Sequence, residues 1–349
     1  MEWDRLILSH SSSKTMLPNS VIECEVYRMY ENKSIIKNKT TSTRAQSKSS
    51  SLLKEFNNSK YLLILLLPCI LYYVIFHYVP MWGVLIAFKD FKAFIGFLDS
   101  KWVGLKYFRL FFKSPDALLL IRNTFLIGAY SIVWGFPMPL IFALVLNEVQ
   151  NMKVKKLVQT VSYMPHFLST VVVVGIIQLL LSSTNGIANQ VISDLGFNKI
   201  NFLQKPGYFR TIYVASGVWQ GMGWGAIVYL AAISGIDPQL YEAAVIDGAN
   251  KFVQITKITI PCIAPTIITL LLLRMGSVLS VGFEKVFLLQ NPTIFSTSDV
   301  ISTYVYRQGM AAGNFSYGTA VGLFNTVINL FFIVVSNALA KKYSETSLW

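Results

Sequence analysis

The chain has 349 residues, of which 54% are hydrophobic and only 13% are charged, a composition that excludes an ordinary soluble domain. Its formal net charge is +13, but the basic residues are scattered among predicted loops without a nucleic-acid-binding motif. We therefore expect no nucleic-acid partner and interpret the charge as membrane topology and contact with membrane lipids. The three cysteines, an odd number, argue against a disulfide framework.

Residues 1–57 differ from the rest of the chain. The stretch 38–51 is polar and of low complexity, which predicts a disordered or surface-bound cytoplasmic N-terminal extension. Apolar runs dominate from residue 58 onward, so we predict one transmembrane domain over 58–349. The first apolar run lies too deep in the chain for a cleaved signal peptide and is expected to serve as an uncleaved anchor.

Six stretches are long enough to cross about 30 Å of hydrocarbon as helices. Backbone polar groups inside lipid must bond to one another, which favours a helix for every span. The sequence therefore predicts an all-α, polytopic membrane helical bundle with six transmembrane helices. The predicted spans lie near 60–80, 122–146, 157–181, 209–235, 262–283 and 319–340.

Lysine and arginine residues near the span ends predict the orientation of the bundle. The N-terminal extension, the 147–156 turn and the C-terminal tail are rich in them, which predicts that both termini are cytoplasmic. The 81–120 connection disagrees, because it is also rich in lysine although six spans would put it outside. We keep the cytoplasmic assignment because the N-terminal cluster usually dominates orientation.

The segment 237–261, between the fourth and fifth predicted spans, is polar where its neighbours are apolar. Asp237 followed by Pro238 is typical of a helix start. Gly248 is suited to end this first helix in a left-handed conformation. Asn250 can cap a second helix, which we expect to stop at the proline that ends the segment. The sequence thus predicts a helix-turn-helix elbow on the membrane surface, with a plain loop as the alternative.

The residue spacing within this elbow resembles the EAA loop of binding-protein-dependent ABC importer permeases. That signature reads Glu-Ala-Ala, three residues, Gly, nine residues, Ile, any residue, Leu-Pro; only Ile260 departs from it, as a conservative replacement of leucine. The resemblance implies that the elbow is a coupling helix, which docks into a groove on a separate ATPase subunit. The residues that it implicates in coupling are Glu242, Ala243, Ala244, Asp247, Gly248, Ile258 and Pro261.

Most of the chain, roughly 57–349, is similar to the LplB-type permeases, a subfamily that imports oligosaccharides and polysaccharide fragments. The similarity implies a MetI-like permease core in the bacterial cytoplasmic membrane. It also implies a homologous second permease subunit, two ATPase subunits and an extracellular sugar-binding lipoprotein as partners. The segments that carry the similarity lie at 76–83, 86–90, 102–105, 163–167, 202–203, 219–224, 280–286, 303–307 and 346–349.

The source of energy separates the main alternatives. No Gly-x-x-x-x-Gly-Lys-Ser/Thr phosphate loop occurs in the sequence, so we expect no cofactor in this chain, and ATP with Mg to be bound by the partner ATPase. The predicted spans hold no interior carboxylate, which disfavours an ion-coupled sugar carrier. The histidines show no metal-ligand or nucleophile–base spacing, which disfavours a membrane enzyme. An ABC importer for another solute class, such as glycerol-phosphate or peptides, stays open.

A substrate path for a sugar is expected to combine aromatic faces with hydrogen-bonding side chains. The glycine-rich fourth span carries Trp219, Gln220 and Trp224, although both tryptophans also suit ordinary packing or an interface belt. Arg274 lies in the fifth span, where a cation needs a partner, so it faces either the path or the partner permease. The further polar candidates are Gln178, Glu284, Tyr304 and Arg307.

Overall fold

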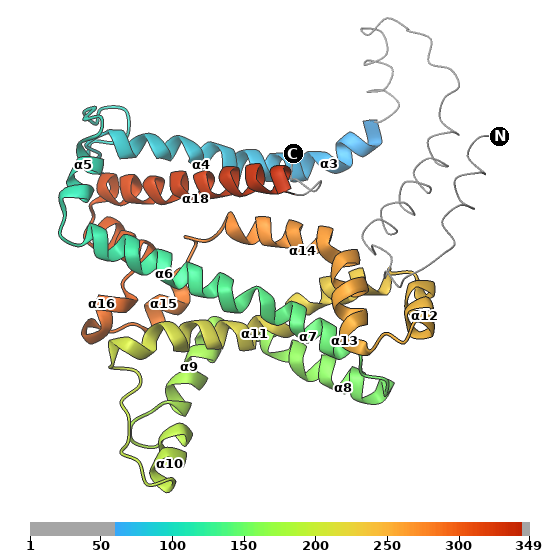
Figure 1. Ribbon diagram of the computed structural model, residues 1–349. Helices are drawn as coiled ribbons and strands as arrows, with labels where there is room; N and C mark the ends of the chain where they lie inside the picture. Colours follow the sequence, from blue (N-terminus) through green and yellow to red (C-terminus); the bar gives the residue numbers. More distant parts are fainter. Residues whose placement is uncertain (1–59, 344–349) are drawn as a thin grey trace, which may run out of the picture. The chain divides into compact units, whose positions relative to one another are not determined.

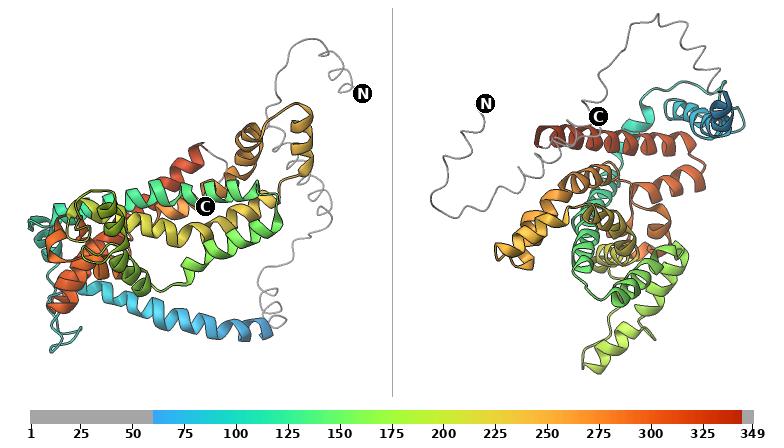
Figure 2. Two further views of the ribbon diagram at one scale, coloured as in Figure 1. Left: turned by 90° about the horizontal axis from the view of Figure 1, so that it is seen from below. Right: turned by 90° about the vertical axis from the view of Figure 1, so that its right-hand side faces the viewer.

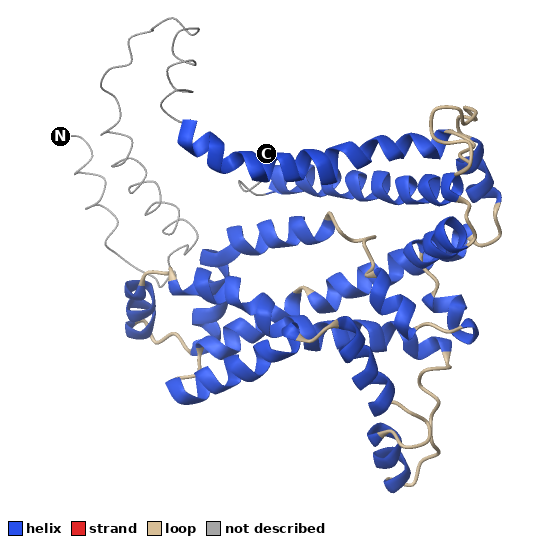
Figure 3. Ribbon diagram, turned by 180° about the vertical axis from the view of Figure 1, so that it is seen from behind, coloured by secondary structure: helices blue, strands red, loops and turns tan. Residues whose placement is uncertain are grey.

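The computed structural model describes residues 60–343, so the predicted extension 1–57 and the segment 346–349 lie outside the described residues (Figure 1). Two compact units make up the described chain: residues 232–264, and residues 60–231 with 265–343. Within this part of the chain helices are the only regular structure, apart from one isolated bridge between Lys89 and Trp102 (Figure 3). The prediction of an all-α membrane bundle is confirmed.

The larger unit holds most of the helices, and the smaller unit holds the elbow and the start of the helix that follows it. The elements of the smaller unit are α12 (Pro238–Ile246), α13 (Lys251–Gln254) and the π-helix η4 (Ile255–Thr259). The other helices are α3 (Lys60–Tyr73), η1 (Val74–Tyr78), α4 (Val79–Met81), η2 (Trp82–Phe88), α5 (Lys106–Lys113), α6 (Ala117–Gly135), α7 (Pro137–Asn147), α8 (Met152–Tyr163), η3 (Met164–Phe167), α9 (Thr170–Leu180), α10 (Ile187–Asp194), α11 (Pro206–Ser234), α14 (Ile260–Met275), α15 (Phe283–Leu289), η5 (Pro292–Ile294), α16 (Phe295–Ser298), α17 (Ile301–Val305), η6 (Tyr306–Ala311) and α18 (Phe315–Tyr343).

The long apolar helices agree with most of the predicted spans. The first span forms one continuous rod, α3 to η2, which Figure 2 shows in blue. The fourth span forms α11, a helix of 29 residues that carries Arg210, Gln220 and several glycines. Within residues 60–343, the helical runs that are long and apolar enough to cross a membrane are Ile64–Phe88, Ala117–Asn147, Lys251–Met275 and Phe315–Ala338.

The third predicted span, 157–181, is wrong as a single straight helix. Its residues belong to two helical segments, Met152–Phe167 and Thr170–Leu180, which meet at an angle of 103°. The break begins at Leu168, whose backbone is extended, and Ser169 then caps α9 by accepting the N–H of Val172. Pro165 just before the break favours a chain that leaves the helix there, because a proline removes one helical hydrogen-bond donor.

Pro261 does not end the second helix of the elbow, contrary to the prediction. The helix that begins at Lys251 continues through this proline to Met275. The π-helical stretch η4 precedes the proline, and the N–H of Ile260 bonds to the carbonyl of Ile255. Proline has no N–H to donate, and its ring clashes with the carbonyl four residues earlier in a regular α-helix. The wider π-helical turn before Pro261 gives the pyrrolidine ring room within the continuous helix.

Two apolar clusters hold the larger unit together. The first joins α6, α9, α11 and α15, and the second joins α5, α6, α17 and α18. They fix the short helices α15 and α17 against the long ones, and with them the polar side chains that the short helices carry. Their most deeply buried members are Phe111, Leu120, Ile127, Val173, Val286, Val300 and Val321.

Two glycines let the backbones of η6 and α18 approach closely. A Cβ atom added to Gly318 would lie 2.6 Å from the Cα of Gly309, and one added to Gly309 would lie 2.9 Å from the Cα of Gly318. Gly322, one turn further along α18, has no atom within 4 Å of the same position. The close contact therefore depends on Gly318 and Gly309 and not on Gly322.

We expect Gly318→Ala to destabilise the protein by about 1–3 kcal/mol, because the added methyl group forces η6 away from α18. Gly322→Ala is the matched control, and its stability should stay equal or rise slightly, since alanine favours the helix more than glycine does. Thermal unfolding of the purified protein in detergent measures both. Equal melting temperatures for the two variants would contradict the close packing of the two backbones.

Candidate functional site

Both helices of the elbow begin with the predicted caps. Asp237 Oδ1 accepts the N–H of Gln239 at 2.9 Å, and Pro238 occupies the first turn of α12. Asn250 Oδ1 accepts the N–H of Val253 at 2.9 Å at the start of α13. Each cap satisfies one of the N–H groups that a helix start leaves without a partner.

The turn between the two helices depends on Gly248. Its φ angle is +77°, in the left-handed region that favours glycine. The N–H of Gly248 bonds to the carbonyl of Val245 at 3.0 Å, and the N–H of Ala249 bonds to that of Ala244 at 2.8 Å. This pair of bonds defines a Schellman motif with Gly248 at its left-handed position. The elbow is thus a rigid helix-turn-helix, as predicted, and not a plain loop.

The outer surface of the elbow is open and partly apolar. Glu242, Ala243, Asp247 and Gly248 are exposed, and Ala244, Ile258 and Pro261 are partly buried. The Tyr241 hydroxyl lies 2.9 Å from the Thr259 hydroxyl and ties α12 to the second helix. Three large apolar side chains stand out on this surface: Val245 is 61% exposed, Ile246 86% and Phe252 74%. These three side chains offer apolar area to a partner surface.

Two predicted substrate-path residues, Gln220 and Trp224, share one face of α11. Gly217, Gln220 and Trp224 follow the spacing i, i+3, i+7, which places them on one side of the helix. Gln220 Nε2 donates to the carbonyl of Leu168 at 3.1 Å. The ring of Trp224 stacks on that of His166, with centroids 4.6 Å apart and planes within 3°. Trp224 keeps 45% of its surface exposed, so the face remains accessible.

A lysine that the sequence did not single out lies beside this face. Lys285 on α15 is buried, with 8% of its surface exposed. Its Nζ donates to the carbonyl of Tyr213 on α11 at 3.2 Å and lies 5.0 Å from the centre of the Tyr213 ring. In the sequence, the one indication of Lys285 is that it lies in the segment 280–286, which carries part of the family resemblance.

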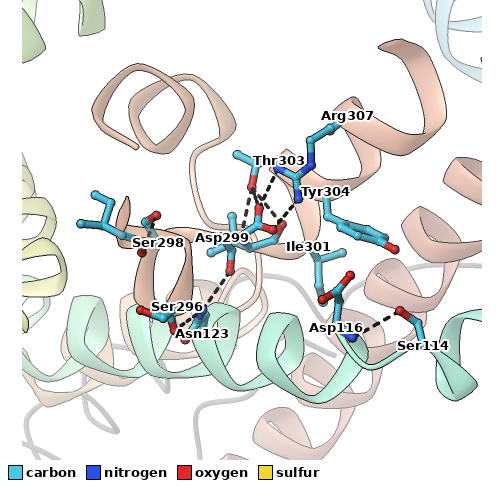
Figure 4. A network of polar contacts seen from close by, with 12 residues as sticks. Ser114, Asp116, Asn123, Ser296, Ser298, Asp299, Ile301, Thr303, Tyr304 and Arg307 are labelled. Atoms are coloured by element: carbon cyan, nitrogen blue, oxygen red, sulfur yellow. Dashed lines mark hydrogen bonds and ion pairs between the residues drawn. The ribbon is translucent and has the colours of Figure 1, made fainter. Parts of the chain in front are cut away.

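A cluster of polar side chains around Asp299 joins the 284–318 connection to α6 (Figure 4). Arg307 donates to both carboxylate oxygens of Asp299, at 3.2 and 2.5 Å, and Thr303 donates to the same carboxylate at 2.9 Å. Asn123 on α6 donates to the backbone carbonyl of Asp299 at 3.1 Å. The Asp299 side chain is 8% exposed and that of Arg307 is 36% exposed. These contacts hold the connection in place.

The remaining predicted path residues do not gather at one point. Tyr304 is buried in the second apolar cluster with its hydroxyl 3.1 Å from that of Tyr317, so it packs inside the chain. Gln178 Nε2 donates to the carbonyl of Leu288 at 3.3 Å. Arg274 is exposed in the last turn of α14, where a cation suits the helix end. Glu284 and Trp219 are exposed, and Trp219 is not on the face of Gln220 and Trp224.

Comparison with protein families decides the class of the chain. Residues 123–345 match the family described as "Binding-protein-dependent transport system inner membrane component". The chain belongs to this family. It is therefore a membrane component of a transport system with a MetI-like permease fold, as the resemblance of its elbow to the EAA loop implied.

Sequence similarity to known permeases extends over nearly the whole membrane domain of this chain. The polygalacturonan/rhamnogalacturonan transport system permease protein YteP of Bacillus subtilis is 44% identical over 304 residues, which are 87% of this chain and 95% of the relative. The protein LplB of the same organism is 43% identical over 302 residues, 86% of this chain and 95% of LplB. A chain of a bacterial alginate ABC transporter, crystallised with an alginate pentasaccharide-bound periplasmic protein, is 40% identical with a TM-score of 0.79, covering 85% of this chain and 99% of that chain.

We expect Arg307→Met to cost this permease about 1–3 kcal/mol of stability, because it leaves the buried Asp299 carboxylate without its counter-charge. Asp299→Asn should cost less, since the partly exposed Arg307 can still reach water. Thermal unfolding of the purified protein in detergent at neutral pH measures both. The double variant Asp299→Asn/Arg307→Met should regain part of the loss caused by Arg307→Met alone. Strictly additive losses would contradict a coupled pair.

Proposed function

We propose that this permease is the membrane-spanning subunit of an ABC importer that moves oligosaccharides or polysaccharide fragments across the bacterial cytoplasmic membrane. Separate ATPase subunits bind ATP and Mg²⁺ and drive transport by pushing on the elbow. Both termini are cytoplasmic in this arrangement, on the same side as the elbow. The single observation that carries the proposal is the rigid elbow itself, capped at both helix starts and presenting exposed apolar side chains.

The shape of the elbow supports docking to an ATPase. A short helix with Ala243 and Ala244 on its surface allows another protein to approach its backbone closely, because the side chains are small. Val245, Ile246 and Phe252 supply apolar area that gains free energy when it is covered. The exposed carboxylate of Glu242 is available to pair with a basic group of the ATPase. Because the turn is rigid, a push on α12 passes to the helix that follows it.

The names of the relatives support the cargo and the other partners. YteP is named for polygalacturonan and rhamnogalacturonan, and the alginate transporter structure includes a periplasmic protein that carries the sugar. Alginate is described as an acidic polysaccharide. By analogy, this permease works with a homologous second permease, two ATPase subunits and an extracellular sugar-binding lipoprotein.

Two alternatives make different predictions. An ABC importer for another solute class would keep the elbow and change the cargo, and the open face of α11 with Trp224 and Gln220 favours a sugar over such a solute. An ion-coupled sugar carrier would need a carboxylate within its spans, where ionisable side chains bind the coupling ion. Among the described residues, the four apolar runs that are long enough to cross a membrane contain no Asp or Glu. This favours ATP as the source of energy.

Gly248→Asp tests the coupling role of the elbow. We expect oligosaccharide uptake by cells that carry the complete transporter to fall at least tenfold, because a charged side chain enters the docking surface at a strained left-handed position. The amount of assembled membrane complex should stay close to that of the wild type. Gly196→Asp is the matched control, since Gly196 also has a positive φ of +84° with no atom near its missing Cβ, and it should leave uptake unchanged. Normal uptake by Gly248→Asp would reject coupling through the elbow.

Ile246→Asp tests the apolar docking surface separately. Because Ile246 is 86% exposed, the substitution should leave the stability of the permease unchanged. We expect the amount of ATPase that co-purifies with the permease to fall about tenfold or more, since burying an unpaired carboxylate in an interface costs several kcal/mol. Leu195→Asp alters an exposed leucine outside the elbow, 69% exposed, and serves as the control. Equal recovery of the ATPase with both variants would show that Ile246 lies outside the interface.

A further inference from the structure

Lys285 holds an ammonium group in an apolar setting with few polar neighbours. The residue is 8% exposed and lies on α15, next to the buried Val286 of the first apolar cluster. Its hydrogen bond to the Tyr213 carbonyl uses one of the three N–H donors of the ammonium. The Tyr213 ring offers a cation–π contact at 5.0 Å. Neither contact supplies a negative charge.

No carboxylate of the described residues forms an ion pair with Lys285. Glu284, its neighbour in sequence, is exposed and makes no ion pair with it in this part of the chain. Burial lowers the pKa of the Lys285 ammonium to about 8, and no nearby charge raises it again. The contrast with Arg307 is clear, because that cation has the Asp299 carboxylate beside it. A buried cation without a counter-charge is costly, and such residues in transport proteins commonly serve a ligand.

The backbone of Gly217 lies next to this ammonium. A Cβ atom added to Gly217 would lie 3.6 Å from Lys285 Nζ, which is the only neighbouring atom within 4 Å of that position. The residue itself is exposed. Because glycine has no side chain, nothing from position 217 covers the ammonium. A group that reaches the surface of α11 at this point meets the ammonium directly.

The same side of α11 carries the other groups that a sugar needs. Gln220 and Trp224 follow Gly217 at the spacing of one helix face, and Trp224 lies about 10 Å further along the axis. Trp224 presents an aromatic ring backed by His166, and Gln220 carries an amide. A cation at one end, an amide between and an aromatic ring at the other fit a sugar that bears a carboxylate.

We propose that Lys285 binds a carboxylate of the transported oligosaccharide beside Gly217, so that the permease selects acidic sugars. The proposal rests on the proposed function, since it assigns a charge to the same cargo. The carboxylate accepts hydrogen bonds from the free N–H groups of Lys285 and supplies the missing counter-charge. A neutral sugar leaves the ammonium buried and unpaired, so it gains less from the same face. Gln220 and Trp224 contact the sugar rings whether or not they are charged.

Uptake of two matched probes by cells that carry the complete transporter tests this site. The probes are labelled trigalacturonate and its fully methyl-esterified form, which keeps the sugar rings and removes the charges. We expect Lys285→Met to raise the KM for trigalacturonate about tenfold to a hundredfold, the range for losing hydrogen bonds to a charged group. Uptake of the methyl ester should change less than about threefold. Lys285→Arg should retain most of the preference for the acid, and Lys205→Met, which alters an exposed lysine just before α11, should behave as the wild type.

The outcomes separate this site from the function on which it rests. If Lys285→Met keeps the wild-type KM for trigalacturonate, or if uptake of both probes falls equally, Lys285 is a packing residue. The proposed carboxylate site is then wrong, while the proposed sugar import stands. If the wild type takes up neither probe, the proposed function fails together with the site. The amount of assembled complex is measured for each variant. Should Lys285→Met fail to assemble, the comparison of Lys285→Gln with Lys285→Arg decides in the same way.

Discussion

Backbone hydrogen bonding inside hydrocarbon is the constraint on which this structure depends. Each N–H and C=O group within a membrane needs a partner from the protein, and helices provide it locally. The chain can leave the helical state only where caps or water replace those bonds. The elbow meets this requirement with Asp237, Asn250 and the Schellman turn at Gly248. These bonds fix both helix starts and the turn between them, which is what an elbow needs to transmit force.

Charged groups obey a related rule, and the larger unit satisfies it in two ways. Arg307 and Asp299 neutralise each other, and together with Asn123 they hold the 284–318 connection against α6. Among the described residues Lys285 has no such partner, and its ammonium lies next to the exposed Gly217 on α11. In the Arg307–Asp299 pair both charges come from the chain itself, so this pair serves to hold the structure together. The Lys285 ammonium lacks a counter-charge among the described residues, so a negatively charged ligand can supply it.

Sequence reasoning predicted the features that depend on local chemistry. Hydropathy located the long helices, and residue type located the caps and the left-handed turn, because each depends on a few neighbouring residues. It failed at the 103° bend after Phe167 and at the helix that runs through Pro261. Both failures involve proline, whose effect on a helix depends on whether the surrounding turn can widen. The π-helical stretch before Pro261 was not visible in the sequence.

The candidate site was harder to predict for a physical reason. Gln220 and Trp224 were correctly placed on one helix, but Tyr304 lies in the core and Arg307 is paired with Asp299. Whether a polar residue faces an open surface depends on contacts between segments far apart in sequence. Lys285 and Gly217 are 68 positions apart, and only the fold brings them together.

The most direct test of the account is uptake by proteoliposomes that contain the assembled transporter with its ATPase and sugar-binding protein. Labelled oligosaccharide is offered on the side of the binding protein, with either ATP on the ATPase side or a proton or sodium gradient without ATP. The account predicts uptake with ATP alone and none with either gradient. Uptake driven by an ion gradient in the absence of ATP would contradict it.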